Sequence, residues 1–285
     1  MDRASALLDW YGRHRREFPW RRTRDPWAIL SVEVMSQQTQ IARVERHWAA
    51  WMAAFPDPAA CAAASPTEVL ALWSGLGYNS RARRLHQAAA IVASDGWPRT
   101  AVDLQRLPGV GPYTAAAVAC QAFGEQVPTV DTNHRRVLSR WVGESLDGRR
   151  LAEVATDLLP VGFAEDWNQA LMDLGAGVCQ PTPRCDDCPV EAWCEDPSVY
   201  GAPPAQAPYE GSSREARGRV LKRLLDGPAT AAALAEATGL AAERVVAALE
   251  ALASESAIER DGDRWAISGS LPSPSPLPNH ADEVT

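Results

Sequence analysis

The sequence predicts an all-α protein that carries a second, small domain near its C-terminus. Over residues 2–192, apolar residues recur at spacings of three and four, and turns such as "FPDP" and "DGWP" separate the periodic segments. Convincing runs with strand-like alternation are missing there. A Pro-, Ala- and Gly-rich stretch at 200–213 is typical of a linker. The first domain is therefore expected to span residues 1–199.

Residues 214–268 predict a winged-helix-like domain. Three short amphipathic segments are followed by "AIERDGDRWAI", which alternates around an Asp-Gly turn as a β-hairpin does. The third segment, "AAERVVAALEALA", has one arginine and two glutamates, a poor composition for a DNA recognition helix. Residues 269–285 are rich in Pro and Ser, and we expect a disordered tail.

Composition limits the classes of protein to which the chain can belong. The sequence contains no apolar run of signal-peptide or membrane-span length, which predicts a cytoplasmic protein without a membrane partner. The net charge of −8 argues against nonspecific wrapping of nucleic acid, although local clusters decide such contacts. Lys222 is the only lysine, so 27 of the 28 Lys and Arg residues are arginines.

Four of the six cysteines crowd into "CQPTPRCDDCPVEAWC", and they are Cys179, Cys185, Cys188 and Cys194. Without a secretory signal, such a cluster indicates a bound metal centre, and four thiolates suit either zinc or a [4Fe-4S] cluster. Spacing alone leaves the two open. Cys61 and Cys120 lie in alanine-rich helical stretches, where we expect buried apolar side chains.

The stretch "LPGVGPYTAAAVA" is a glycine loop that opens into a helix. A dinucleotide fingerprint would need a preceding strand and a third glycine, but Thr114 stands in that place. A nucleotide P-loop would need a Gly-Lys pair. The remaining functional interpretation is a helix-hairpin-helix turn, in which the N–H groups of Gly109 and Gly111 face a DNA phosphate. An ordinary tight turn is the alternative.

Two carboxylates are candidates for acid–base chemistry. Glu33 stands in the apolar run "WAILSVEVM", where burial would raise its pKa and suit a general acid; a surface glutamate is the alternative. Asp131, in "VDTNHRR", could stabilise a positive charge that forms on a sugar, or it could simply cap a helix.

Several other side chains are suited to contacts with DNA. Gln37, Gln38 and Thr39 offer amide and hydroxyl groups for base edges. Tyr78, on a glycine turn before three arginines, could be an aromatic wedge between bases or a core tyrosine. The densest positive patch comprises Arg13, Arg15, Arg16, Arg21, Arg22 and Arg24.

Taken in order, these motifs resemble those of the MutY-type adenine DNA glycosylases, which belong to the helix-hairpin-helix superfamily. The matching segments, within residues 7–194, include "LSVEVMSQQTQIARV", "LWSGLGYNSRARRLHQAA", "LPGVGPYTAAAVA", "VDTNHRRVLSR" and "WNQALMDLGAGVCQP". The resemblance implies an all-α, two-lobed glycosylase that flips a base out of double-stranded DNA. It also implies a [4Fe-4S] cluster held by the four clustered cysteines.

The resemblance assigns roles to individual residues. Glu33 would protonate the departing adenine, and Asp131 would stabilise the sugar cation, with Tyr113 and Asn133 hydrogen-bonding around them. The other positions that match DNA-contacting or base-contacting residues are Arg16 and Trp20 in the adenine pocket, Gln38 at the opposite base, and Tyr78 between bases.

The sequence departs from the family pattern at three places. The gap between Cys179 and Cys185 holds five residues where six are usual. Asn79 follows Tyr78 where a second aromatic residue is common. A Nudix-like C-terminal domain, which checks for 8-oxoguanine in the family, is not recognisable, and the winged-helix-like domain stands in its place.

The function that follows is a monomeric, nucleoid-associated glycosylase that removes adenine mispaired with 8-oxoguanine or guanine. Tyr113 stands where a strand-cutting relative would carry a lysine nucleophile, so no lysine-dependent lyase activity is expected. One alternative is a T/G or U/G mismatch glycosylase of the same superfamily, which the Gln37–Thr39 run disfavours. A second is a non-catalytic, metal-containing DNA-binding protein.

Overall fold

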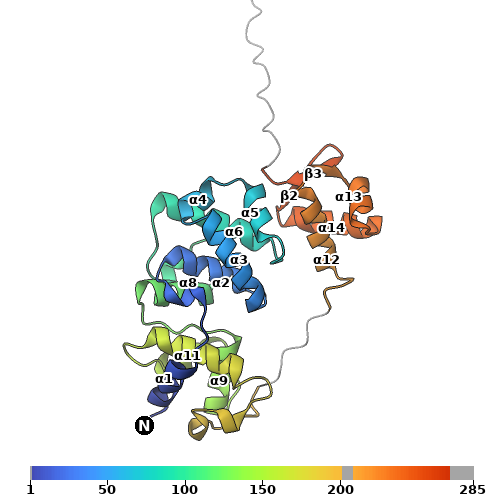
Figure 1. Cartoon of the computed structure of the whole chain (residues 1–285). Coiled ribbons are helices and arrows are strands. Elements are labelled where there is room, and N and C mark those ends of the chain that lie inside the picture. Colours follow the sequence, from blue (N-terminus) through green and yellow to red (C-terminus); the bar gives the residue numbers. More distant parts are fainter. Residues whose placement is uncertain (1, 201–207, 270–285) are drawn as a thin grey trace, which may run out of the picture. The chain divides into compact units, whose positions relative to one another are not determined.

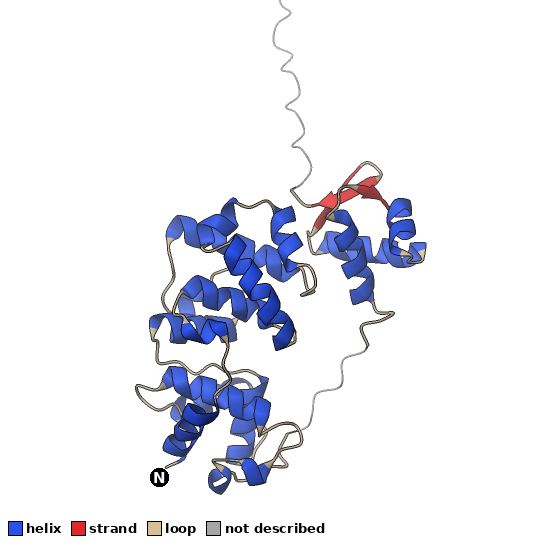
Figure 2. Ribbon diagram, in the orientation of Figure 1, coloured by secondary structure: helices blue, strands red, loops and turns tan. Residues whose placement is uncertain are grey.

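The computed structural model describes residues 2–200 and 208–269. Most of the predicted linker and tail, residues 201–207 and 270–285, lies outside the described residues. Internal contacts divide the chain into two compact units, Met1–Ala63 with Arg84–Ala207 and Ala64–Arg83 with Pro208–Thr285. Helices dominate, and a small sheet is confined to the C-terminal segment (Figure 2). The all-α fold class is therefore confirmed, and the expected domain boundaries stay a prediction.

Residues 2–200 form a succession of helices joined by loops (Figure 1). Their bounds are α1 (Arg3–His14), η1 (Pro19–Arg22), α2 (Pro26–Ser36), α3 (Ile41–Ala54), α4 (Pro58–Ala63), α5 (Pro66–Trp73), α6 (Ser80–Asp95), α7 (Ala101–Leu104), α8 (Pro112–Phe123), α9 (Thr132–Val142), α10 (Gly148–Asp157), α11 (Ala164–Gly177), η2 (Cys185–Asp187) and η3 (Glu191–Trp193). None of the helices in the described part of the chain is both long and apolar enough to span a membrane.

Helix α2 is the buried centre of one lobe of the first unit. Its start is fixed by Asp25, whose carboxylate accepts hydrogen bonds from the N–H groups of Trp27 and Ala28 at 3.1 and 3.3 Å. Apolar residues surround the helix on almost every side, so it packs against both α3 and α8 (Figure 1). Glu33 is the one acidic residue within this helix.

The predicted hairpin forms between α7 and α8. Gly109 adopts a left-handed φ of +79°, and a Cβ there would stand 2.8 Å from Cβ of Arg84, so glycine serves both the turn and the close approach. Gly111 is the N-cap of α8, and Pro112 occupies its first turn. A buried run of small apolar residues from Ala115 to Ala119, four of them alanines, lets α8 lie close to α2.

A second lobe of the same unit contains α1, α9, α10 and α11. Its core includes Leu7 from α1, Trp141 from α9 and Trp167 from α11, and the two tryptophan rings lie 5.9 Å apart. The cysteine loop begins where α11 ends, and its first cysteine, Cys179, belongs to this core. Helix α11 also packs against α8, which links the two lobes.

The C-terminal segment has the element order of a winged helix. Helices α12 (Ser213–Leu224), α13 (Ala231–Thr238) and α14 (Ala242–Ser254) pack against one another. The predicted hairpin consists of β2 (Ile258–Asp261) and β3 (Arg264–Ile267). Strand β1 (Ala229–Thr230) was not predicted, because it is too short to show a pattern in the sequence. It pairs antiparallel with β3 and gives the sheet the order β1-β3-β2.

Candidate active site

Glu33 is a partly buried side chain at the interface of α2 and α8. Its side chain hydrogen-bonds with Tyr113 and Gln121, both on α8. Burial raises the pKa of Glu33 from 4.5 to about 7, and the negative charge of Asp131 adds to this rise. The two hydrogen bonds and the positive charge of Arg21 oppose it. Glu33 is therefore substantially protonated at neutral pH.

Asp131 is the N-cap of α9, and donors surround its carboxylate. Its Oδ1 accepts a hydrogen bond from the backbone N–H of His134 at 2.8 Å and lies 2.7 Å from Nδ1 of the same residue. Its Oδ2 accepts a hydrogen bond from Asn133 at 2.9 Å. Burial acts to raise the pKa of Asp131, but these contacts outweigh it, and the net pKa lies below 3.8.

The two carboxyl groups thus have opposite preferences for a proton. At a pH between their two pKa values, Glu33 can donate a proton while Asp131 carries a negative charge. Burial and the two neighbouring carboxylates raise the pKa of Tyr113 well above 10, so its hydroxyl stays protonated. Such an arrangement can protonate a leaving group and stabilise a cation, which are the two requirements of glycosidic bond cleavage.

Glu33 and Asp131 do not themselves line a polar cavity of about 500 Å³, but a hydrogen-bond partner of Glu33 does. Gln121 lines the cavity and also hydrogen-bonds with Glu33, so the cavity adjoins the acid. Its lining residues are Tyr11, Arg15, Arg16, Glu17, Arg21, Arg22, Thr23, Gln121, Glu165, Asp166 and Gln169. Amide, guanidinium and carboxylate groups therefore meet in a space adjacent to the acid.

A buried ion pair holds two arginines of this cavity in place. Asp173, on α11, is 3% exposed and accepts hydrogen bonds from both Arg16 and Arg21. Arg21 binds it in bidentate fashion, at 2.7 and 2.9 Å, and also donates to the carbonyl oxygen of Arg16. These bonds fix the positive charge that acts on Glu33.

The four clustered cysteines lie around the end of α11 and the two short turns that follow. Burial, together with the charges of the other three thiols, raises the pKa of Cys188 to about 11. The guanidinium of Arg140 lies 3.2 Å from Sγ of Cys179, and its Nε is buried without a partner in the described residues. Within residues 2–200 and 208–269, no three His, Cys, Asp or Glu side chains are arranged to hold a single metal ion.

The hairpin loop presents two donors. The N–H groups of Gly109 and Gly111 have no acceptor within the described parts of the chain, while the neighbouring N–H of Val110 bonds to Leu107. Both glycines are at least partly exposed at the start of α8. Donors at a helix N-terminus are suited to an anion such as a phosphate.

Comparison with known proteins identifies the family. Residues 32–158 match the model of the HhH-GPD superfamily base excision DNA repair proteins. The adenine DNA glycosylase of Mycolicibacterium smegmatis is 41% identical over 278 residues, which cover 92% of this chain and 95% of that protein. This chain belongs to the adenine DNA glycosylase family.

Solved structures agree with the fold. A thermostable thymine-DNA glycosylase matches 67% of this chain and 93% of its own, with 34% identity and a TM-score of 0.64. An endonuclease III bound to DNA matches 68% of this chain and 92% of its own, with a TM-score of 0.60. At 23% identity, the second match supports the fold alone.

The other residues predicted to contact DNA differ in their exposure to solvent. Trp20 is buried, stacked on Phe18 with ring centroids 4.9 Å apart, and it is not among the residues that line the polar cavity. Gln38 is exposed and adopts a left-handed φ of 54°. Thr39 is half-buried, and its hydroxyl donates to the carbonyl oxygen of Gln37.

Tyr78 belongs to the other compact unit and also adopts a left-handed backbone, with φ of 48°. The guanidinium of Arg81 lies 5.6 Å from the centroid of its ring and donates to the carbonyl oxygens of Leu76 and Gly77. A non-glycine residue at positive φ is strained, and such strain is often kept where a side chain must be presented for binding. The positions of Tyr78 and Gln38 fit that pattern.

Sequence reasoning missed several residues that build the site. Gln121, His134 and Asp173 act through contacts between segments far apart in the chain, which no local pattern reveals. Arg136 was assigned no role, yet it is buried and donates to Asn133, to Gly175 and to the carbonyl oxygen of Cys179. A glycine at 175 is required there, since a Cβ would stand 2.6 Å from Cβ of Asn133.

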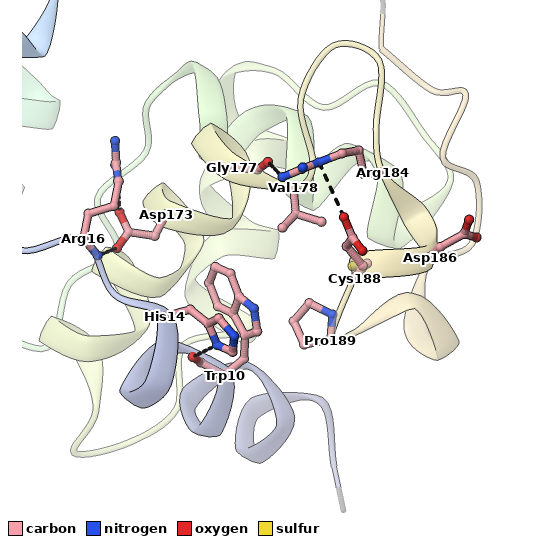
Figure 3. A pocket seen from close by; sticks show the side chains of 11 residues that line it. Trp10, His14, Arg16, Asp173, Gly177, Val178, Arg184, Asp186, Cys188 and Pro189 are labelled. Atoms are coloured by element: carbon pink, nitrogen blue, oxygen red, sulfur yellow. Dashed lines mark hydrogen bonds and ion pairs between the residues drawn. The ribbon is translucent and has the colours of Figure 1, made fainter.

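A further cavity, of about 550 Å³, lies between α1, the end of α11 and the cysteine loop (Figure 3). Trp10 and His14 stack on one side with their ring planes only 11° apart, and Arg184 donates to the carbonyl oxygen of Gly177 on the other. Neither side chain that hydrogen-bonds with Glu33 lines this cavity, whereas Gln121 lines the polar cavity, so the polar cavity is the better candidate for catalysis.

The raised pKa of Glu33 predicts a pH-dependent cost to stability. Below pH 4.5 the carboxyl is protonated in the folded and unfolded states alike, but as pH rises to about 7 and beyond, the folded state resists ionisation. Glu33→Gln should therefore raise the free energy of unfolding at pH 8, by on the order of 3 kcal/mol, and have little effect near pH 4.5.

Denaturant unfolding of both proteins at pH 5 and pH 8 measures this difference. Glu45→Gln, at an exposed position on α3, is the matched control and should show no such pH dependence. A Glu33→Gln protein that is equally stable or less stable than the parent at pH 8 would contradict the raised pKa.

Proposed function

We propose that this protein hydrolyses the N-glycosidic bond of adenine mispaired with 8-oxoguanine or guanine in double-stranded DNA. The observation that carries the proposal is the pairing of a neutral Glu33 with an ionised Asp131 beside a polar cavity. The membership of the adenine DNA glycosylase family supports the choice of base. We further expect a monomer that acts at the nucleoid.

In the proposed reaction, the adenine leaves the base stack and enters the cavity next to Glu33. The carboxylic acid of Glu33 transfers its proton to a ring nitrogen of adenine, so the bond between the base and C1′ breaks with its electron pair going to a neutral base. Asp131 stabilises the positive charge that remains on the sugar. Water adds to C1′, and Glu33, now a carboxylate, accepts the proton that the water releases.

The chemistry of Glu33 favours a purine over a pyrimidine. Adenine has unsubstituted ring nitrogens, such as N7, that can accept a proton before its bond to the sugar breaks, whereas in thymine and uracil one ring nitrogen carries the sugar and the other already carries a hydrogen. The similarity to a thymine-DNA glycosylase keeps T/G and U/G mismatches as the second candidate. The Gln37–Thr39 run, with its exposed Gln38 beside α2, supports contact with a purine opposite the adenine.

We also propose that the product strand stays intact. Cleavage by a lyase needs an amine nucleophile that forms a Schiff base with C1′ of the sugar. Tyr113 occupies the start of α8, and Lys222, the only lysine, lies in α12 of the C-terminal segment. Base release without strand scission follows from this distribution.

We propose that Cys179, Cys185, Cys188 and Cys194 hold a [4Fe-4S] cluster. Thiolates are the ligands that such clusters use, and the four thiols are close enough to shift the pKa of Cys188. The unpartnered Nε of Arg140 supplies a buried positive group for the negative sulfur atoms. When bound, the cluster would supply a rigid cross-link of the loop rather than a step in hydrolysis.

A panel of four labelled duplexes tests the function. A opposite 8-oxoguanine, A opposite G, T opposite G and U opposite G are incubated with the protein under single-turnover conditions, with and without alkali. We expect release from the two adenine duplexes, with strand breaks only after alkali. Release from T or U alone would replace adenine by the second candidate, and breaks without alkali would contradict the proposed absence of lyase activity.

Glu33→Gln is the control for the chemical step. General acid catalysis contributes roughly 100-fold or more, so this variant should bind the adenine duplex with the affinity of the parent and release base at least about 100-fold more slowly. Equal binding with no release by either protein would indicate a non-catalytic DNA-binding protein instead.

Metal analysis tests the cofactor. Anaerobically purified protein should contain about four iron atoms and four sulfides per chain, as a [4Fe-4S] cluster requires. Cys188→Ser should lose the iron, whereas Cys61→Ser, at a buried cysteine outside the loop, should retain it. Stoichiometric zinc in place of iron would contradict the proposal.

A further inference from the structure

His134 lies in the first turn of α9, and its ring is 1% exposed. The ring stands between two oxygen atoms that come from different helices. Its Nδ1 is 2.7 Å from Oδ1 of Asp131, and its Nε2 is 3.1 Å from the backbone carbonyl oxygen of Asn168 on α11. Both distances are those of hydrogen bonds.

The chemistry of imidazole makes this placement informative. A neutral ring has one N–H donor and one bare nitrogen, whereas the protonated ring has two donors. A carboxylate oxygen and a carbonyl oxygen can only accept. A neutral His134 would therefore direct a lone pair at one of the two oxygens, in a buried position where an unsatisfied polar contact is costly.

We propose that His134 is held as an imidazolium ion that pairs with the carboxylate of Asp131 and positions it for reaction. The inference rests on the proposed function, in which Asp131 stabilises the sugar cation. It goes beyond that function because it assigns a positive charge to a residue that does not touch the substrate. His134 is thus a positioning residue that acts through Asp131.

The contacts around Asp131 show how the positioning works. Oδ1 is occupied by both the backbone N–H and the ring of His134, and Oδ2 receives the amide of Asn133. The carboxylate cannot rotate without losing these bonds. Asp131 is 20% exposed, so the charged pair stands at the edge of the buried region.

Asn168, whose backbone carbonyl oxygen is the hydrogen-bond acceptor for Nε2, is also held in place. The side chain of Asn168 accepts a hydrogen bond from the N–H of Thr129 at 3.0 Å and donates to the carbonyl oxygen of Val127 at 2.9 Å. These bonds tie α11 to the segment that leads into Asp131. The oxygen atoms that flank the ring therefore belong to a rigid frame.

The electrostatic consequence concerns both carboxyl groups. The described groups that face the ring are the Asp131 carboxylate and the Asn168 carbonyl, and Glu33 acts on Asp131 from α2. A charged ring makes the Asp131–His134 pair neutral overall. It keeps Asp131 ionised in a site that must also approach DNA phosphates, in keeping with the lowered pKa of Asp131.

Two substitutions separate the two ring contacts. In His134→Asn, the side-chain amide nitrogen replaces Nδ1 and remains a neutral donor to Asp131. In His134→Gln, the side-chain amide nitrogen replaces Nε2 and keeps only the contact with Asn168. Both remove the positive charge, so the pKa of Asp131 rises. The acidic limb of base release should move to higher pH by about one unit or more, further for Gln than for Asn.

The test combines this pH profile with a direct measurement of the ring. Nitrogen-15 NMR of histidine-labelled protein, assigned by comparison with His134→Asn, should show both nitrogens of His134 protonated at pH 7. His14→Gln, at an exposed position on α1, is the control and should leave both readouts unchanged. The chain has only five histidines, which keeps the spectrum simple.

A neutral ring with one bare nitrogen at pH 7 would overturn the proposal, as would slower variants whose pH profiles are unshifted. The NMR readout is independent of activity. If the protein fails to release adenine while the ring is protonated, the proposed function fails and the charged pair stands.

Discussion

The site depends on the placement of one carboxyl group, that of Glu33, in an apolar interface. Helix α2 is almost wholly buried, and an ionised glutamate within it would lose most of its hydration. As a result, the pKa of Glu33 is raised to about 7, and hydrogen bonds from α8 partly compensate for the lost hydration. A carboxyl group that is costly to ionise, and that hydrogen-bonds with a residue lining a cavity, is suited to donate a proton to a substrate.

The surroundings of Asp131 favour the ionised form of its carboxyl group, in contrast to those of Glu33. The same kind of burial acts on this carboxylate, but it caps a helix and receives three donors, so the anion is favoured. Small residues make this arrangement possible. The alanines of α8 allow α2 to pack closely against it, and the absence of a Cβ at Gly175 leaves room for the side chain of Asn133. The two lobes thus bring together two carboxyl groups in different protonation states.

Local patterns in the sequence were sufficient to predict the elements that carry the two carboxyl groups. The apolar run around Glu33, the glycine hairpin and the position of Asp131 ahead of a helix each follow from neighbouring residues, and the described elements match them. The sequence offered a helix cap and a catalytic role as alternatives for Asp131. The two are compatible, because the cap fixes the carboxylate whose charge acts on Glu33.

The contacts that tune the site could not be predicted in this way. Asp173 meets Arg16 and Arg21 across more than 150 residues, and His134 meets Asn168 across 34. Such pairs depend on how α9 and α11 pack, which is a property of the whole fold. The same limit applies to Arg136 and Arg140, which are buried against the cysteine loop although nothing in the neighbouring sequence indicates it.

The opposite protonation of Glu33 and Asp131 is the property on which the proposed chemistry depends, and carboxyl carbon-13 NMR measures it directly. Spectra recorded across a pH series, with Glu33→Gln and Asp131→Asn for assignment, resolve each group. We expect Glu33 to titrate near pH 7 while Asp131 remains ionised throughout the range from pH 5 to 8. Two carboxylates both ionised at pH 6, or a proton held by Asp131 instead of Glu33, would contradict the account.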